Sequence, residues 1–401
     1  MFRAQYCAIL GFGLMLAAAS TEARELEFSI ENRIVADSNV FRTSSDRIED
    51  GSYVLSPRIS VSQKNSRLNY SLSYQPTYEA FFTTSGINGF DHWGQANFSW
   101  RPTAVDTLSF DGNYASRRTL RIENFGSGAP LETSDRERVQ RADARLSYRH
   151  ALSQVLSVDL TAAFQDLDYS RNTSIDSRFI SGRLGGQYVL TPVTLISLSG
   201  TIRQRENLGG DSRLTTETTI WDLAASVQRN LTPTLVLSVQ AGPSFIRTKQ
   251  KFPNPIPLPD EKSRSTSFFA VASLEKRWQR SNFTASYTRS ESNGSGTTAS
   301  SINDYISLDF THRLDRRWSF GIFGSWLESE EITSLPGGRR QKTTQYRAFV
   351  SLTRKVARRV SVTTQFSIFD QDQNGSTRSG SIGRVYSGFL SLRYTFDPVV
   401  F

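Results

Sequence analysis

One acidic stretch near the C-terminus has the spacing of a calcium-binding loop. Asp370-Gln-Asp372-Gln-Asn374-Gly375 places oxygen ligands at the first, third and fifth positions and a glycine at the sixth, as such a loop requires. The twelfth position is Ser381, where that loop has a bidentate glutamate. Asp370, Asp372 and Asn374 are therefore an incomplete set of calcium ligands, and an external turn rich in Gly and Asn is the alternative.

Histidine chemistry depends on one pair of residues. Of the three histidines, His92 directly follows Asp91, and an Asp–His pair can supply a general base if a nucleophile or activated water lies beside it. No serine-hydrolase motif, phosphate-binding loop, dinucleotide fingerprint or Cys/His metal spacing accompanies the pair. We therefore expect no enzymatic activity and no cofactor. An outer-membrane hydrolase that uses His92 is the weakest alternative.

A third set consists of arginines that alternate with apolar residues, so that they share the polar face of their strands. They are Arg141, Arg145, Arg183, Arg203, Arg347 and Arg393. If the apolar face contacts lipid, these side chains line a lumen, and their excess over acidic residues predicts a pore with a mild preference for anions. The alternative is that Arg and Asp pair across the lumen as struts, which leaves selectivity undetermined.

The elements that would position these residues are β-strands. From Leu26 onward, apolar and polar residues alternate with a period of two, as in Leu156, Val158, Leu160, Ala162 and Phe164, and no 3.6-residue stripe competes. We count about 18 such segments. Aromatic residues fall near their ends, where membrane-interface girdles form. The sequence predicts an all-β transmembrane antiparallel up-and-down barrel.

The connections between the segments alternate between two kinds. Short turns such as Lys64-Asn65-Ser66 alternate with long polar connections at 119–138, 250–264, 291–300, 330–341 and 371–381. Both ends of the barrel segment fall on the short-turn side, as in outer-membrane barrels. A propeller, whose repeat is also near 40 residues, packs four short strands into that length where this chain has two long ones. The propeller and a two-sheet sandwich are the minor alternatives.

The composition excludes a helical membrane protein and indicates export. The chain has 401 residues, a mean hydropathy of −0.40, and 21% charged residues. Its apolar run at 7–19 is too short to span a bilayer and is typical of a secretory signal, although a buried N-terminal helix is an alternative. We expect residues 1–23 to be a cleaved signal peptide and residues 24–401 to be the barrel. The one cysteine, Cys7, lies in the signal, so the mature barrel would contain no disulfide.

The formal charge of +9 indicates an anionic partner. An exported chain does not meet nucleic acid, and the basic residues are scattered along the sequence, so we expect contact with outer-membrane lipid and lipopolysaccharide. The proline-rich segment from Phe252 to Pro259 would cap the mouth, narrow it, contact a partner or serve as a surface spacer. The last strand, which ends at Phe401, resembles the signal that the barrel-assembly machinery recognises.

Three features together resemble a known family. The strand pattern, the turn Asn230-Leu-Thr-Pro-Thr234 before Leu235-Val-Leu-Ser-Val239, and the final Tyr394-Thr-Phe396 are similar to the β-barrel porin family found with bacterial exopolysaccharide systems. The resemblance implies a channel in the outer membrane of a Gram-negative bacterium that exports polysaccharide with periplasmic export components. The lumen arginines are similar in kind to those of alginate exporters, but they form no dense belt. A non-conducting barrel that docks envelope partners is the alternative.

Overall fold

The computed structural model describes residues 24–43, 46–122, 131–170, 176–208, 215–251, 261–292, 301–331, 342–374 and 383–401. The expected signal peptide at 1–23 and the proline-rich segment at 252–259 lie outside these residues. The described chain is almost entirely β-strand, apart from the short 3₁₀ turn η2 (Ser85–Ile87). The strands are β1 (Glu25–Asp37), β2 (Asp50–Lys64), β3 (Leu68–Phe81), β4 (Gly89–Trp100), β5 (Asp106–Ile122), β6 (Leu131–Ala151), β7 (Leu156–Tyr169), β8 (Asp176–Thr191), β9 (Thr194–Leu208), β10 (Thr215–Thr232), β11 (Leu235–Lys251), β12 (Glu261–Arg277), β13 (Ser281–Ser292), β14 (Ser301–Arg313), β15 (Trp318–Glu331), β16 (Lys342–Lys355), β17 (Val360–Asn374), β18 (Val385–Thr395) and β19 (Val399–Val400).

These strands form one antiparallel sheet that closes on itself. Each strand from β1 to β17 pairs with the next along the chain. β18 pairs back with β1, from Ser29 opposite Thr395 to Asp37 opposite Ser387. The two-residue β19 continues β18 along β1. The expected up-and-down barrel of about 18 strands is confirmed, and the propeller and sandwich alternatives are wrong.

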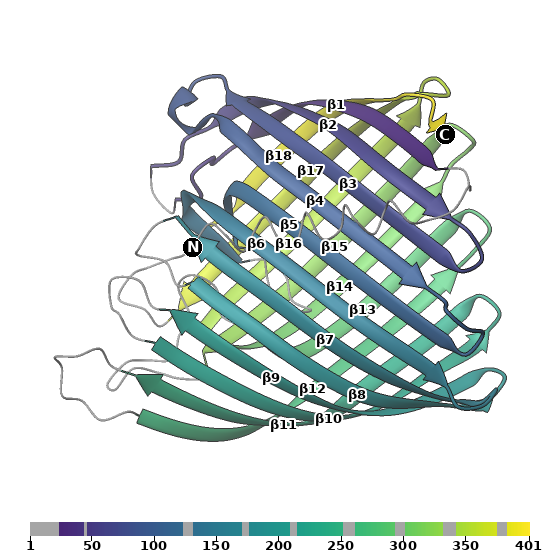
Figure 1. Cartoon of the computed structure of the whole chain (residues 1–401). Helices are drawn as coiled ribbons and strands as arrows, with labels where there is room; N and C mark the ends of the chain where they lie inside the picture. Colours follow the sequence, from purple (N-terminus) through teal and green to yellow (C-terminus); the bar gives the residue numbers. More distant parts are fainter. Residues whose placement is uncertain are drawn as a thin grey trace.

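The two ends of the barrel differ as expected. Tight turns gather at one end together with the C-terminus (Figure 1), and the strand ends that the longer connections join lie at the other. Glu25 of β1 lies opposite Val400 at the short-turn end, so both ends of the barrel segment meet there. We refer to the opposite end, which carries the longer connections, as the outer end.

Several strands extend further toward the outer end than the alternation predicts. Residues 119–138 and 250–264 were expected to be loops, but β5 continues to Ile122, β6 begins at Leu131, β11 continues to Lys251 and β12 begins at Glu261. Beyond the bilayer, lipid no longer selects apolar residues on one face, so the alternation fades although the backbone ladder continues.

The outer wall of the barrel is apolar. Many large hydrophobic side chains on it are exposed, among them Leu160, Leu184, Leu198, Leu223, Val239, Ile322 and Leu390. Trp100, Tyr148 and Tyr188 are exposed near the short-turn ends of their strands, and Tyr74, Tyr114, Trp221 and Tyr346 are exposed further along strands that continue beyond them. Soluble monomers rarely expose an apolar surface this large, and a closed barrel leaves no backbone group unpaired in lipid. The wall therefore faces a bilayer. Among the described residues, no helix has the length and hydropathy needed to cross a membrane.

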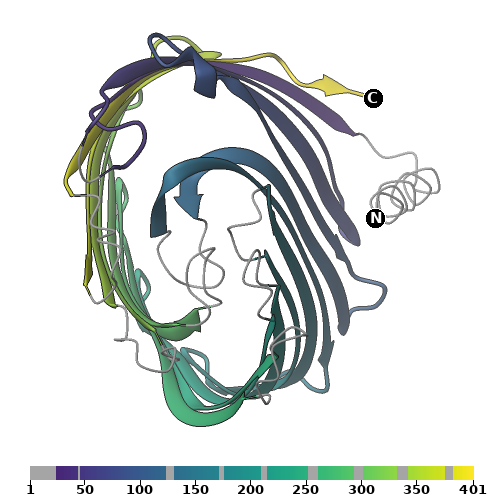
Figure 2. The ribbon, with the colours of Figure 1, turned by 90° about the vertical axis from the view of Figure 1, so that its left-hand side faces the viewer.

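A hairpin occupies part of the barrel interior. β5 and β6 pair with each other as far as Ile122 opposite Leu131. The pairing of β5 with β4 stops earlier, at Ser116, and the pairing of β6 with β7 stops at Val139. Seen along the barrel, the extended tip of this hairpin curves inward across the opening (Figure 2). The interior at the outer end is therefore narrower than the wall alone would leave it.

Small apolar clusters lie on the inner wall toward the outer end. Ile220, Ile246, Leu167 and Leu327 are all buried there, on the face opposite the lipid-facing residues. A hydrophilic inner wall was expected throughout, so this region is a correction. The physical reason is that water does not reach these side chains, and surface without access to water favours apolar residues.

Candidate lumen site

The strongest charged cluster of the lumen lies on β9, β10 and β11. Arg203 donates to both carboxylate oxygens of Asp222, from Nε to Oδ2 at 2.8 Å and from Nη2 to Oδ1 at 3.0 Å. Ser244 Oγ also donates to Asp222 Oδ1 at 2.6 Å. A two-pronged guanidinium–carboxylate contact fixes both charge and geometry. Arg203 is therefore held against the wall.

Arg205 and Glu291 lie next to this cluster. Arg205 is 2% exposed and donates from Nε to Asn207 Oδ1 at 2.7 Å. Glu291, 8% exposed, lies within electrostatic reach of both Arg203 and Arg205. Glu291 reaches the interior because β13 leaves the ladder with β12 after Arg289, opposite Ala270.

A second cluster lies on β5, β6 and β7. Arg141 Nε donates to Asp143 Oδ2 at 2.7 Å, and Asn113 Nδ2 donates to the same oxygen at 3.3 Å. Gln165 Nε2 donates to the other oxygen of Asp143. This carboxylate therefore gathers donors from all three strands.

Arg145 differs from Arg141 although it occupies the same face. It is exposed in the lumen, opposite Asp111 on β5 and Ala163 on β7. Among the described side chains it makes no ion pair or hydrogen bond. An unpaired guanidinium in an aqueous lumen attracts anions.

The other three candidate arginines also face inward, at separate places. Arg183 lies between Thr161 and Thr201, and Arg393 Nη2 donates to Glu31 Oε2 at 2.5 Å across the β18–β1 seam. Arg347 lies on β16 opposite Ser325. The six arginines thus share the inner face as their alternation predicts. They form no single ring, and several act as struts with acidic partners.

The calcium-loop residues lie along a strand. Asp370 and Asp372 belong to β17, opposite Tyr346 and Thr344, and Asn374 is its last residue. Alternate side chains of an extended strand are about 7 Å apart, whereas a calcium loop bends to bring its oxygens around one ion. No group of three or more His, Cys, Asp or Glu side chains gathers as a metal site within the described ranges. The calcium site stays a prediction, because residues 375–382 lie outside them.

Asp91 and His92 do not form the pair that a hydrolase would need. Neighbouring residues of a strand point to opposite faces. His92 Nδ1 lies 2.8 Å from the Tyr74 hydroxyl, which is on the outer wall. Asp91 instead accepts the backbone N–H of Arg118 at 2.7 Å. The Asp–His interpretation is therefore wrong.

Sequence reasoning missed Arg205 and Glu291 for different reasons. Arg205 follows Arg203 by two positions, so extending the alternation would have placed it on the inner face. Glu291 gave no such signal. The alternation of Phe283, Ala285 and Tyr287 assigns it to the outer wall, and only the departure of β13 from β12 turns it inward.

No protein-family model and no curated protein matches the chain. Several solved structures are similar to the chain at low identity. OpdQ of Pseudomonas aeruginosa is 10% identical, with 94% of this chain and 98% of that chain covered and a TM-score of 0.44. OccAB3 of Acinetobacter baumannii is 10% identical, with 94% and 99% covered and a TM-score of 0.45. OccK2 (OpdF) of Pseudomonas aeruginosa, solved in complex with glucuronate, is 10% identical, with 93% and 98% covered and a TM-score of 0.43.

At this identity the likeness concerns the path of the backbone alone. The location follows from the molecule itself, because closed antiparallel barrels with an apolar belt and aromatic girdles are the membrane-spanning architecture of outer membranes. The protein is an outer-membrane β-barrel of a Gram-negative bacterium.

Proposed function

We propose that the protein is a channel that passes small polar solutes across the outer membrane, with a preference for anions. The observation that carries the proposal is the unpaired, exposed Arg145 on the inner wall of a closed 18-strand barrel. A barrel of this strand number is wide enough to hold water. The inward β5–β6 hairpin narrows the path and brings solutes closer to the wall.

The paired arginines supply a different part of this function. Arg203 with Asp222, and Arg393 with Glu31, are each close to neutral as pairs. They stiffen the wall and add little net field, so the anion preference rests mainly on Arg145 and Arg183. Nothing in the geometry favours a long polysaccharide over small solutes, and export of polysaccharide stays a prediction.

The test is the reversal potential of the refolded mature chain in a planar bilayer with a salt gradient. We expect anion preference, and we expect Arg145→Gln to lower the anion-to-cation permeability ratio by up to about fivefold, since a unit charge at 4 Å in water contributes on the order of 1 kcal/mol. Arg316→Gln, in the exposed turn between β14 and β15, is the control and should change little. Cation preference would overturn the anion assignment. A folded but electrically silent barrel would overturn the channel and favour a docking role.

A further inference from the structure

The outer wall carries a group of basic side chains at one level of β11 and β12. Arg247 lies directly opposite Arg264, and Lys249 lies opposite Lys262 in the same ladder. All four face outward, because Arg247 and Lys249 continue the lipid-facing series of Phe245, and Arg264 and Lys262 lie on the face of Phe268. The basic residues look scattered along the sequence, but the register gathers these into a patch, which corrects the earlier expectation.

This patch begins where the apolar belt ends. On three neighbouring strands the last belt residues are Trp221, Phe245 and Thr266, which pair across the strands. β11 advances about ten residues from Leu235 to Phe245. At about 3.3 Å per residue and a tilt near 45°, this part of the strand rises about 23 Å along the membrane normal, close to the height of a lipid-facing belt. Arg247 and Arg264 therefore lie at the headgroup level of the outer leaflet.

The two arginines lack acidic partners. Like charges directly opposite each other in a sheet destabilise it unless a counter-charge is near. Among the described side chains, neither guanidinium makes an ion pair or hydrogen bond. Three other outward cations near the outer end have carboxylate partners: Arg178 with Asp166, Lys342 with Glu328, and Lys251 with Glu217.

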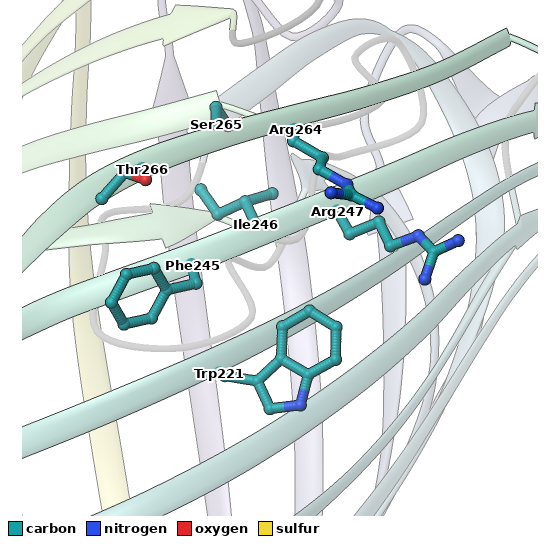
Figure 3. A pocket seen from close by; sticks show the side chains of 7 residues that line it. All are labelled: Trp221, Phe245, Ile246, Arg247, Arg264, Ser265 and Thr266. Atoms are coloured by element: carbon teal, nitrogen blue, oxygen red, sulfur yellow. The ribbon is translucent and has the colours of Figure 1, made fainter.

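A pocket adjoins the pair. Its cavity is about 380 Å³ and is lined by Trp221, Phe245, Ile246, Arg247, Arg264, Ser265 and Thr266. The two arginine side chains extend in the same direction from neighbouring strands, next to the Trp221 indole (Figure 3). Guanidinium groups bind phosphate through paired hydrogen bonds, and aromatic side chains at the interface contact lipid chains.

We propose that Arg247 and Arg264 bind a phosphate on the headgroup of an outer-leaflet lipid, whose acyl chains lie along Trp221 and Phe245. The patch faces the bilayer and not the lumen, so the site is independent of the channel function. It would fix the depth and orientation of the barrel in the leaflet and neutralise the repulsion between the two guanidinium groups.

The experiment is native mass spectrometry of the folded full barrel, released from detergent with added bisphosphorylated lipid A. We expect Arg247→Gln with Arg264→Gln to weaken lipid A binding roughly 30-fold, and each single change roughly 5-fold, in line with the usual contribution of a basic residue near an anionic membrane surface. The matched control is Arg178→Gln with Lys342→Gln, which removes the same charge from outward cations that have carboxylate partners. A difference in gel mobility between the unheated and the heated sample verifies that each variant is folded.

Two further arms identify the bound group. Dephosphorylated lipid A should bind as weakly to the wild type as the intact lipid binds to the double variant. Inorganic phosphate at millimolar concentration should compete poorly, because it lacks the acyl chains that contact Trp221 and Phe245. Equal loss in the control double variant, no loss in the arginine double variant, or phosphate binding without lipid A binding would each overturn the proposal.

Discussion

On the inner wall, Arg203 lies 2.8 Å from Asp222 and Arg393 lies 2.5 Å from Glu31, whereas Arg247 and Arg264 on the outer wall face each other without a carboxylate. Of the two inner pairs, Arg203 with Asp222 is largely buried, and an unpaired charge is costly there. The outer pair lies at a lipid headgroup layer that supplies negative charge. The buried Arg203 therefore has its counter-charge built into the wall, whereas the counter-charge of Arg247 and Arg264 would come from the headgroups.

The largest expected effect comes from breaking an inner pair. Asp222→Ala removes the carboxylate that accepts two guanidinium hydrogen bonds from Arg203, on a wall where Asp222 itself is 8% exposed. Loss of one partner of a buried pair costs about 3–5 kcal/mol, so we expect the free energy of unfolding to fall by about that much. Urea titration in lipid vesicles, followed by tryptophan fluorescence, measures it.

The matched variant removes both charges together. Arg203→Met with Asp222→Leu should recover most of the lost stability, because an apolar pair of similar volume leaves no unpaired charge. An unfolding free energy that stays at the wild-type value in Asp222→Ala would show that the pair is not a strut.

The next prediction tests the level at which the apolar belt of the outer wall meets the lipid headgroups. Val227, opposite Val239, lies near the middle of the apolar belt and is 46% exposed, and Thr219 lies opposite Arg247 beyond Trp221. An arginine at the bilayer midplane of a barrel costs about 2–4 kcal/mol and one near the interface about 0–1 kcal/mol. We therefore expect Val227→Arg to destabilise the barrel clearly and Thr219→Arg to have little effect in the same titration. Equal costs at the two positions would move the membrane boundary and remove the basis for the headgroup site.

Contact with lipid also explains which parts of the fold the sequence could predict. Lipid imposes strict alternation on residues such as Leu156 to Phe164, so strand number, inward arginines and the short-turn end followed from the pattern. Outside the bilayer that constraint disappears, which is why the extensions of β5, β6, β11 and β12 were read as loops.

The functional neighbourhoods were harder to predict because they depend on pairing. Arg247 and Arg264 are separated by the proline-rich loop in sequence and meet only through the β11–β12 register. Glu291 is turned inward by a local loss of pairing with β12. Neither arrangement leaves a signal in the alternation of a single strand.

The smallest expected effect comes from a substitution that makes the basic patch on β11 and β12 more positive. Lys251 pairs with Glu217, which lies opposite Lys249 at the edge of the patch. Because the pair is half-exposed and solvent screens it, Glu217→Gln should change the unfolding free energy by less than about 1 kcal/mol. It should nevertheless strengthen lipid A binding severalfold, because it leaves one more uncompensated positive charge at the headgroup level. The control is Glu328→Gln, which acts on Lys342 away from the patch and should leave lipid A binding at this site unchanged. If both changes strengthened binding equally, the affinity would follow overall charge and not the arrangement on β11 and β12. If Glu217→Gln weakened binding, positive charge at this patch would not be what holds the lipid.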